Sequence, residues 1–138
     1  MTFAEALAPV VVDASAAVEL LGGDEDWREF FDGWAQEDRM LLAPPTFLAE
    51  VANGQLRGQR VAVSDIATRL ERLAATGIET ADRGLAGLLE AIDLADRHGL
   101  TVYDALYLQL ALDVEGELAT LDADLRRAAT TEGLSIVG

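Results

Sequence analysis

The feature of this sequence that most constrains its fold is a set of five short apolar runs in which apolar residues do not alternate with polar ones. Such runs are typical of parallel strands, because a parallel strand is usually covered on both faces and buries the side chains of both. The predicted strands are residues 9–12, 40–43, 77–79, 117–121 and 134–137. A sheet built from them needs other elements to cover its two faces.

Segments with helical periodicity separate these runs and can supply that cover. The predicted helices are residues 14–21, 24–38, 46–60, 65–75, 85–98, 101–114 and 122–131, with Ser64 as the N-cap of the fourth. Strands that alternate with helices predict an α/β fold in which helices flank a central five-stranded parallel sheet. The length of 138 residues is typical of one domain, so residues 1–138 are predicted to form a single domain.

Composition restricts the chemistry that such a fold can carry. All ten basic residues are Arg, there is no Lys and no Cys, and His98 is the only His. These counts exclude P-loop NTPases, Schiff-base enzymes, thiol nucleophiles and cysteine-zinc sites, and they nearly exclude His-based triads. A formal net charge of −15 also argues against a large basic face. An active site is therefore expected to use carboxylates, hydroxyls, amides and Arg.

The sequence also predicts where the protein resides. The N-terminal segment carries Glu5 and lacks the basic start and the apolar run of a signal peptide. No stretch approaches the roughly 20 uncharged apolar residues of a membrane span. We therefore expect a cytoplasmic protein that does not contact a membrane.

Three acidic residues stand at element ends that the predicted fold could bring together. Asp13 directly follows the first strand, and Asp122 directly follows the fourth. Ligands of open α/β sheets bind beyond the carboxyl ends of the strands, so both residues should lie at that edge. Asp104 lies in the first turn of a helix that is apolar almost all round, where a carboxylate is costly unless it is paired, capped or bound to a metal.

A fourth acid, Glu50, lies on the polar face of the third predicted helix. That face consists of Thr46, Glu50, Asn53 and Arg57, at spacings of i, i+4, i+7 and i+11. The apolar positions expected to face the core are Phe47, Leu48, Val51 and Leu56. This arrangement allows Glu50 to join the acids at the sheet edge.

Each acid also has a purely structural interpretation. Asp13 and Asp122 could be N-caps of the helices that follow them, and Thr101 with Asp104 nearly forms a capping box. Glu50 could be a solvated surface residue. Four carboxylates in one pocket, however, cannot all ionise comfortably without cations, and the chain has no Lys. A divalent cation with oxygen ligands is the natural partner of such a group.

Four stretches carry a resemblance to a known family: VVVDASAAVELL, PTFLAEVANGQLRG, LTVYDALYLQLA and ELATLDADLRRAA. In this order and spacing they resemble the PIN-domain ribonucleases, and most closely the VapC toxins of prokaryotic toxin–antitoxin pairs. The resemblance covers almost the whole chain. It implies that the family's metal-binding and catalytic acids fall on Asp13, Glu50, Asp104 and Asp122. Its implied outer partners of the metal are Ser15 and Thr120, to which we add Asn53 from the polar face of Glu50.

The resemblance also implies an activity and partners. VapC toxins are Mg²⁺- or Mn²⁺-dependent endoribonucleases that cleave RNA with a metal-activated water, and a cognate VapB antitoxin blocks them. For this chain we expect an antitoxin whose C-terminal arm carries an Arg, and a homodimer. RNA would approach along a basic strip, either Arg57 and Arg60 or Arg126 and Arg127. Both pairs could equally be solvated helix faces.

Two questions stay open at this level. The aromatic cluster of Trp27, Phe30, Phe31 and Trp34 could be an antitoxin or dimer surface, or it could pack its helix onto the sheet. A catalytically silent PIN-like module that acts through protein partners is the alternative function, because acidic residues alone do not prove turnover. Phosphoacceptor receiver domains and haloacid-dehalogenase-type phosphatases are excluded, because both need a Lys.

Overall fold

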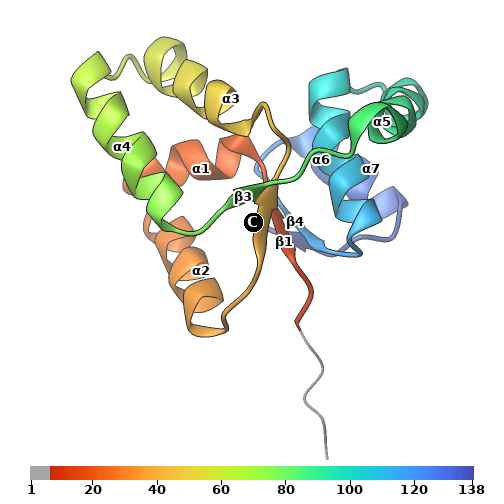
Figure 1. The fold of residues 1–138 in the computed structure, drawn as a ribbon, viewed down its shortest axis with the longest axis horizontal. Coiled ribbons are helices and arrows are strands. Elements are labelled where there is room, and N and C mark those ends of the chain that lie inside the picture. Colours follow the sequence, from red (N-terminus) through yellow and green to blue (C-terminus); the bar gives the residue numbers. More distant parts are fainter. Residues whose placement is uncertain (1–6) are drawn as a thin grey trace, which may run out of the picture.

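Five parallel strands form the centre of the structure (Figure 1). The computed structural model describes residues 7–138. The strands are β1 (Val10–Val12), β2 (Leu41–Ala43), β3 (Glu79–Thr80), β4 (Glu117–Ala119) and β5 (Ile136–Val137). Their order across the sheet is β3-β2-β1-β4-β5, and each neighbouring pair is parallel. The predicted five-stranded parallel sheet is confirmed.

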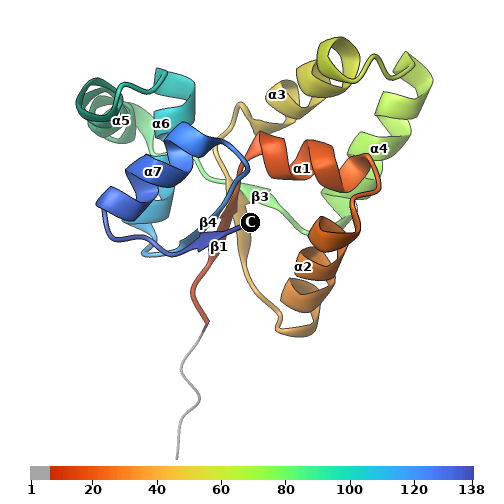
Figure 2. The same cartoon turned by 180° about the vertical axis from the view of Figure 1, so that it is seen from behind.

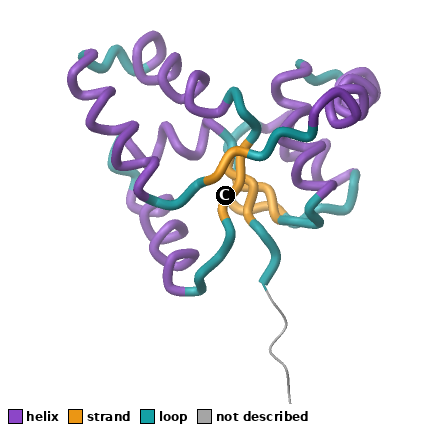
Figure 3. The backbone as a smooth tube through the Cα atoms, in the orientation of Figure 1, coloured by secondary structure: helices purple, strands orange, loops and turns teal. Residues whose placement is uncertain are grey.

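Helices flank this sheet on both sides, as predicted. They are α1 (Ala14–Leu21), α2 (Glu25–Gln36), α3 (Phe47–Asn53), α4 (Val63–Ala75), α5 (Gly84–His98), α6 (Val102–Asp113) and α7 (Ala123–Thr131), and a π-helical turn, η1 (Gly54–Gly58), continues α3. Figures 1 and 2 show α1 to α4 on one side of the strands and α5 to α7 on the other. The strands therefore lie between two groups of helices, which Figure 3 shows by colour. Within residues 7–138, no helix combines the length and the apolar composition needed to cross a membrane.

Two strands are shorter than their apolar runs because the preceding residues close a helix. Gly77 has a φ of +84°, and its amide donates to the Ala74 carbonyl at 3.2 Å, so it ends α4 instead of starting β3. The Leu134 amide donates to the Ala129 carbonyl at 2.9 Å, which closes α7 before β5 begins. The strand starts predicted at residues 77 and 134 were therefore early.

The single helix predicted over residues 46–60 is divided into α3 and η1, which is a correction. Gly54 begins the π-helical turn where it crosses α1, and a Cβ there would come within 2.9 Å of a valine methyl of α1. Residues of the wider turn no longer follow the α-helical spacing. Gln55 points inward and is fully buried, whereas Leu56, predicted to face the core, is exposed.

Two smaller predictions on this side of the sheet are also wrong. Leu48 is exposed, because the fully buried Phe47 and Val51, one turn apart, occupy the inward direction of α3. Ser64 is not an N-cap, because α4 begins at Val63 and Ala62 occupies the cap position. The Ser64 carbonyl instead accepts a 3.3 Å hydrogen bond from the Thr68 hydroxyl inside the helix.

Most of the aromatic cluster of α2 lies in the hydrophobic core. Trp27, Phe31 and Trp34 are buried in the same hydrophobic cluster that contains the central strand β1, and Phe30 is the one exposed member of the four. The aromatics of α2 therefore pack that helix onto the protein core. The same is true of α6, which is buried from Ala105 through Ala111 with the exception of the half-buried Leu106.

Helix α5 differs from the other helices in the direction of its apolar residues. The buried residues of this helix are mostly small, namely Gly87, Ala91 and Ala95 together with Leu94. The larger apolar side chains on its outer surface are exposed, namely Leu85, Leu88, Leu89 and Ile92. Helix α5 therefore presents most of its large apolar side chains to solvent in the described structure.

Candidate active site

The acids at the ends of β1 and β4 lie at the same edge of the sheet. β1 pairs directly with β4, with Val12 opposite Ala119, and the Asp13 amide donates to the Ala119 carbonyl at 2.9 Å. Asp122 follows β4 by three residues and begins α7. The expected neighbourhood of the first and fourth strands, and of the residues that follow them, is therefore present.

Asp13 is held by two hydroxyls through a single oxygen. Its Oδ2 accepts hydrogen bonds from Thr120 Oγ1 at 2.5 Å and from Ser15 Oγ at 2.9 Å. Asp13 occupies the N-cap position of α1, as the capping interpretation predicts, but its side chain does not make the usual capping hydrogen bond. Burial raises the pKa of the Asp13 carboxyl, and the bonds from Thr120 and Ser15 oppose that shift.

The two hydroxyls are themselves fixed from the β4–α7 connection. The Leu121 amide donates to Ser15 Oγ at 3.0 Å, and the Asp122 amide donates to Thr120 Oγ1 at 3.0 Å. Each hydroxyl accepts a main-chain hydrogen bond and donates its own proton to Asp13. This network ties β1, α1 and the start of α7 into one unit around Asp13.

Glu50 is held in the same manner by residues of α3 and α6. Its Oε2 accepts hydrogen bonds from the Tyr107 hydroxyl at 2.8 Å and from Thr46 Oγ1 at 3.0 Å. The pKa of Glu50 is raised, first by burial and then by the charges of Asp13 and Asp104, while the bonds from Tyr107 and Thr46 oppose the shift. Glu50 is therefore held in place by two hydrogen bonds, close enough to Asp13 and Asp104 to feel their charges.

Asp104 and Asp122 are placed by the starts of two helices. Thr101 caps α6 by accepting the Asp104 amide at 3.1 Å, and Asp122 caps α7 by accepting the Leu125 amide at 2.8 Å through Oδ1. The capping interpretation is therefore correct for Asp122. Burial and then the Asp122 charge raise the pKa of Asp104, and the charge of Asp13 adds to the shift.

Like charges thus act on one another across this site without an internal counter-charge. Within residues 7–138, no Arg or His forms an ion pair with any of the four acids, and the ion pairs that do form join other carboxylates. In the same part of the chain, no group of three or more acidic or imidazole side chains lies close enough together to hold a metal ion. A Mg²⁺ ion usually takes only one or two carboxylates and keeps several waters, and the oxygen ligands present here are of the type that it prefers.

The remaining predicted site residues make no hydrogen bond with the four acids. Asn53 is exposed and makes no side-chain hydrogen bond with the described residues. Arg57 and Arg60 are exposed on and after η1. Arg126 donates to the carbonyls of Thr120 and Gly138, so it is occupied by the main chain.

Tyr107 is the site residue that our sequence analysis missed. It is fully buried and lies three residues after Asp104, which places the two on neighbouring positions of α6. A buried tyrosine hydroxyl needs a hydrogen-bond partner, and that requirement was the available signal. The polar face of α3 did include Thr46, but not its role as a donor to Glu50.

The fold and the acidic edge agree with a family comparison. The model of the PIN domain family matches residues 10–130, which is most of the chain. The chain therefore belongs to the PIN domain family, as its sequence motifs predicted. The matched region contains all four acids of the edge.

Individual relatives extend this result. Ribonuclease VapC3 of Pyrobaculum aerophilum is 53% identical over 38 residues, which are 28% of this chain and 29% of that protein. The crystal structure of PAE2754 from the same organism is 26% identical, covers 98% of this chain and 93% of its own, and has a TM-score of 0.69. The matched stretch thus spans under a third of VapC3, whereas the structural match is nearly complete.

Two further structures share the fold at lower identity. A toxin–antitoxin complex from Klebsiella pneumoniae is 15% identical with a TM-score of 0.68, and FitAcB from Neisseria gonorrhoeae is 20% identical with a TM-score of 0.59. Each match covers 94% of this chain and 96% of the other. At these identities they show the shared fold alone.

Proposed function

We propose that this protein is a Mg²⁺- or Mn²⁺-dependent endoribonuclease that acts as the toxin of a VapBC-type pair in the cytoplasm. The observation that carries the proposal is the group of Asp13, Glu50, Asp104 and Asp122. Burial and the charges of Asp13 and Asp104 raise the pKa of Glu50, and burial and the charges of Asp122 and Asp13 raise the pKa of Asp104. No base among the described residues forms an ion pair with any of the four acids. Membership of the PIN domain family and the similarity to a ribonuclease support the same activity.

The mechanism assigns each group a separate task. A bound divalent cation supplies a Lewis acid and lowers the pKa of the attacking water. Asp13 and Glu50 each present one carboxylate oxygen that accepts no side-chain hydrogen bond from the described residues. Asp104 and Asp122 add negative charge at the starts of α6 and α7. No side-chain nucleophile is required, and His98 is engaged with Glu132 at 2.7 Å.

RNA is expected to approach along Arg57 and Arg60. Both side chains are exposed, and Arg57 lies on the η1 turn that continues the helix of Glu50. The other predicted strip is less available, because Arg126 donates to main-chain carbonyls and Arg127 pairs with Asp124 at 2.9 Å. Phosphate contacts supply much of the affinity of a protein for nucleic acid, so removing the first pair should weaken RNA binding more than removing Arg127.

The inhibitory partner in this proposal is a VapB-type antitoxin with an Arg in its C-terminal arm. An Arg can neutralise paired carboxylates through two parallel hydrogen bonds. The net charge of −15 should speed the capture of such a basic arm. Co-expression with the product of the neighbouring gene, followed by purification, should yield a stable complex. If changing the arm Arg to Ala leaves RNA cleavage fully inhibited, neutralisation of the acidic site is not the means of inhibition.

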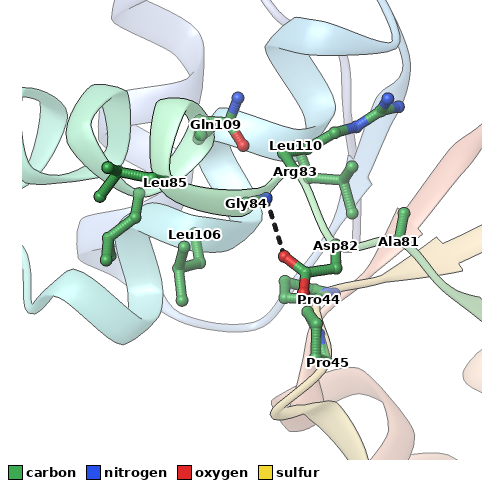
Figure 4. A pocket seen from close by; sticks show the side chains of 12 residues that line it. Pro44, Pro45, Ala81, Asp82, Arg83, Gly84, Leu85, Leu106, Gln109 and Leu110 are labelled. Carbon is green, nitrogen blue, oxygen red and sulfur yellow. Dashed lines mark hydrogen bonds between the residues drawn. The ribbon is translucent and has the colours of Figure 1, made fainter.

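A homodimer is supported by the outer face of α5. Leu85, Leu88 and Leu89 are exposed there and continue into a pocket of about 450 Å³ that none of the four acids lines. Figure 4 shows this pocket between the start of α5, the Pro44–Pro45 turn and α6. Contiguous exposed apolar side chains are typical of protein–protein contacts. Leu89→Asp should therefore give a monomer in sedimentation velocity, whereas Val63→Asp on α4 should not.

The direct test of the function is metal-dependent RNA cleavage. Purified protein should cleave structured RNA with Mg²⁺ or Mn²⁺, lose the activity in EDTA, and lose it in the folded Asp104→Asn variant. In cells, wild type should arrest bacterial growth, and Asp104→Ala should relieve the arrest at equal protein level. A wild-type protein that binds its partner but cleaves no RNA under any of these conditions would instead be the catalytically silent module.

A further inference from the structure

Tyr107 engages one specific oxygen of Glu50. The tyrosine has no exposed surface, and its hydroxyl donates to Glu50 Oε2 at 2.8 Å, where Thr46 Oγ1 also donates at 3.0 Å. A carboxylate oxygen has about two lone-pair sites, so these two donors occupy Oε2. The other oxygen, Oε1, accepts no side-chain hydrogen bond from residues 7–138.

The same arrangement recurs on a second acid that comes from a different element. Oδ2 of Asp13 accepts both Thr120 Oγ1 at 2.5 Å and Ser15 Oγ at 2.9 Å, and Oδ1 accepts no side-chain hydrogen bond from the described residues. Two carboxylates, one after β1 and one on α3, therefore each accept both of their side-chain hydroxyl bonds on a single oxygen, which is clamped in this way. The main chain of Ala14 and Ser15 also bonds the Asp13 carboxylate, so the open second oxygen is clearest at Glu50.

This pattern limits how a cation can bind. Each clamped carboxylate can give one oxygen, whereas bidentate coordination would break two hydrogen bonds. Ca²⁺ takes six to eight oxygens at about 2.3–2.6 Å and often uses a carboxylate in bidentate fashion. Mg²⁺ takes single oxygens in a near-octahedral arrangement at about 2.0–2.1 Å and keeps its waters. One-oxygen presentation should therefore favour the smaller ion.

We propose that Tyr107 is a positioning residue of the acidic site, whose hydroxyl holds Glu50 to one free oxygen and thereby makes the site prefer Mg²⁺ and Mn²⁺ over Ca²⁺. The inference rests on the metal site of the proposed function and adds an ion selectivity to it. Tyr107 acts through Glu50 and does not itself touch the ion. The Tyr107 hydroxyl donates to Glu50 from α6, and the Thr46 hydroxyl donates to the same oxygen from the N-cap position of α3.

The test compares two tyrosines of the same helix. Tyr107→Phe removes the clamping hydroxyl, and Tyr103→Phe removes an exposed hydroxyl one turn away that bonds no described residue. Calorimetric titrations with Mn²⁺ and with Ca²⁺ give both affinities for each variant. We expect Tyr107→Phe to weaken Mn²⁺ binding about 10-fold, as for other outer partners of metal ligands, and to narrow the Mn²⁺-to-Ca²⁺ affinity ratio. Tyr103→Phe should leave both affinities unchanged.

The ratio separates positioning from a general structural role. Equal weakening of both ions, or wild-type affinities in folded Tyr107→Phe, would overturn the inference. Should Tyr107→Phe not fold by circular dichroism, Thr46→Val removes the second donor and must narrow the same ratio. A wild-type protein that binds neither ion would overturn the metal site and this inference together. Selective Mn²⁺ binding without RNA cleavage would reject the proposed function and support the clamp.

Discussion

The two halves of the acidic site hold their carboxylates in different ways. Asp13 and Glu50 each accept two side-chain hydroxyls, one of them from a distant segment, whereas the bonds that place Asp104 and Asp122 are made within the starts of their own helices. All four acids lie at helix N-termini, where the helix dipole favours a negative charge. We therefore expect the first pair, which is tied to a second segment of the chain, to set the geometry of cation binding.

Among substitutions of residues other than the four acids, we expect the largest loss of stability and metal affinity at Thr120, which donates to Asp13. Thr120→Val removes the 2.5 Å donor to the buried Asp13 carboxylate. We expect a loss of stability of about 1–3 kcal/mol, because a buried acceptor loses its partner. Metal affinity should fall roughly 10- to 100-fold, as is usual for outer partners of metal ligands. Urea unfolding and Mn²⁺ calorimetry measure the two effects.

Ser15→Ala is the matched control for this prediction. Ser15 gives the longer bond of 2.9 Å and is less buried than Thr120, so its loss should cost less in both measurements. Equal losses from both variants would show that the two hydroxyls do not differ in holding Asp13.

The pH dependence of stability should reveal the raised pKa values of three of the acids. The folded pKa values of Asp13, Glu50 and Asp104 are raised, so the folded metal-free protein binds protons more tightly than the unfolded chain. The metal-free form is then least favoured when all three are ionised, and it gains stability as pH falls through the raised values toward their ordinary range. Protons compete with a cation at the same groups.

The rise in melting temperature caused by Mg²⁺, relative to EDTA, should therefore be largest near neutral pH and shrink toward about pH 5. Scanning fluorimetry at both pH values measures the difference. A rise that does not change over this range would contradict the assignment of the cation to these carboxylates.

The smallest effects should come from neutralising the helix-start acids in the absence of metal. Asp104→Asn removes one charge from the repelling group and should stabilise the metal-free protein by about 1 kcal/mol. Asp122→Asn should change stability by less than about 0.5 kcal/mol, because Asn is as good an N-cap as Asp. Urea unfolding in EDTA measures both. Destabilisation by Asp104→Asn would show that its charge is compensated in the folded state.

The sequence predicted the parts of this structure that depend on local pattern and strand order. The apolar runs identified the five parallel strands, and the position of Asp13 directly after β1 and of Asp122 three residues after its neighbour β4 placed both near one edge. Helix-start chemistry identified the capping role of Asp122 correctly. These features need only periodicity and short-range spacing, which a single sequence contains.

The parts that the sequence did not predict depend on contacts between distant segments. The bond from Tyr107 to Glu50 joins residues 57 positions apart, and it links α6 to α3, which belong to the two groups of helices on opposite sides of the strands. The π-helical turn follows from the close approach of Gly54 to α1, which no local propensity encodes. The sequence did not show which apolar residues of α5 face the core and which face solvent, because both faces of this helix carry apolar residues.

Whether the four acids bind a divalent metal can be measured by titrating Mn²⁺ into wild type and into Asp13→Asn by calorimetry at neutral pH. Asn keeps the shape of the side chain and removes the charge of the most buried acid. We expect saturable binding to wild type and at least about 100-fold weaker binding to folded Asp13→Asn. Binding of equal strength to both proteins, or no binding to either, would contradict this expectation.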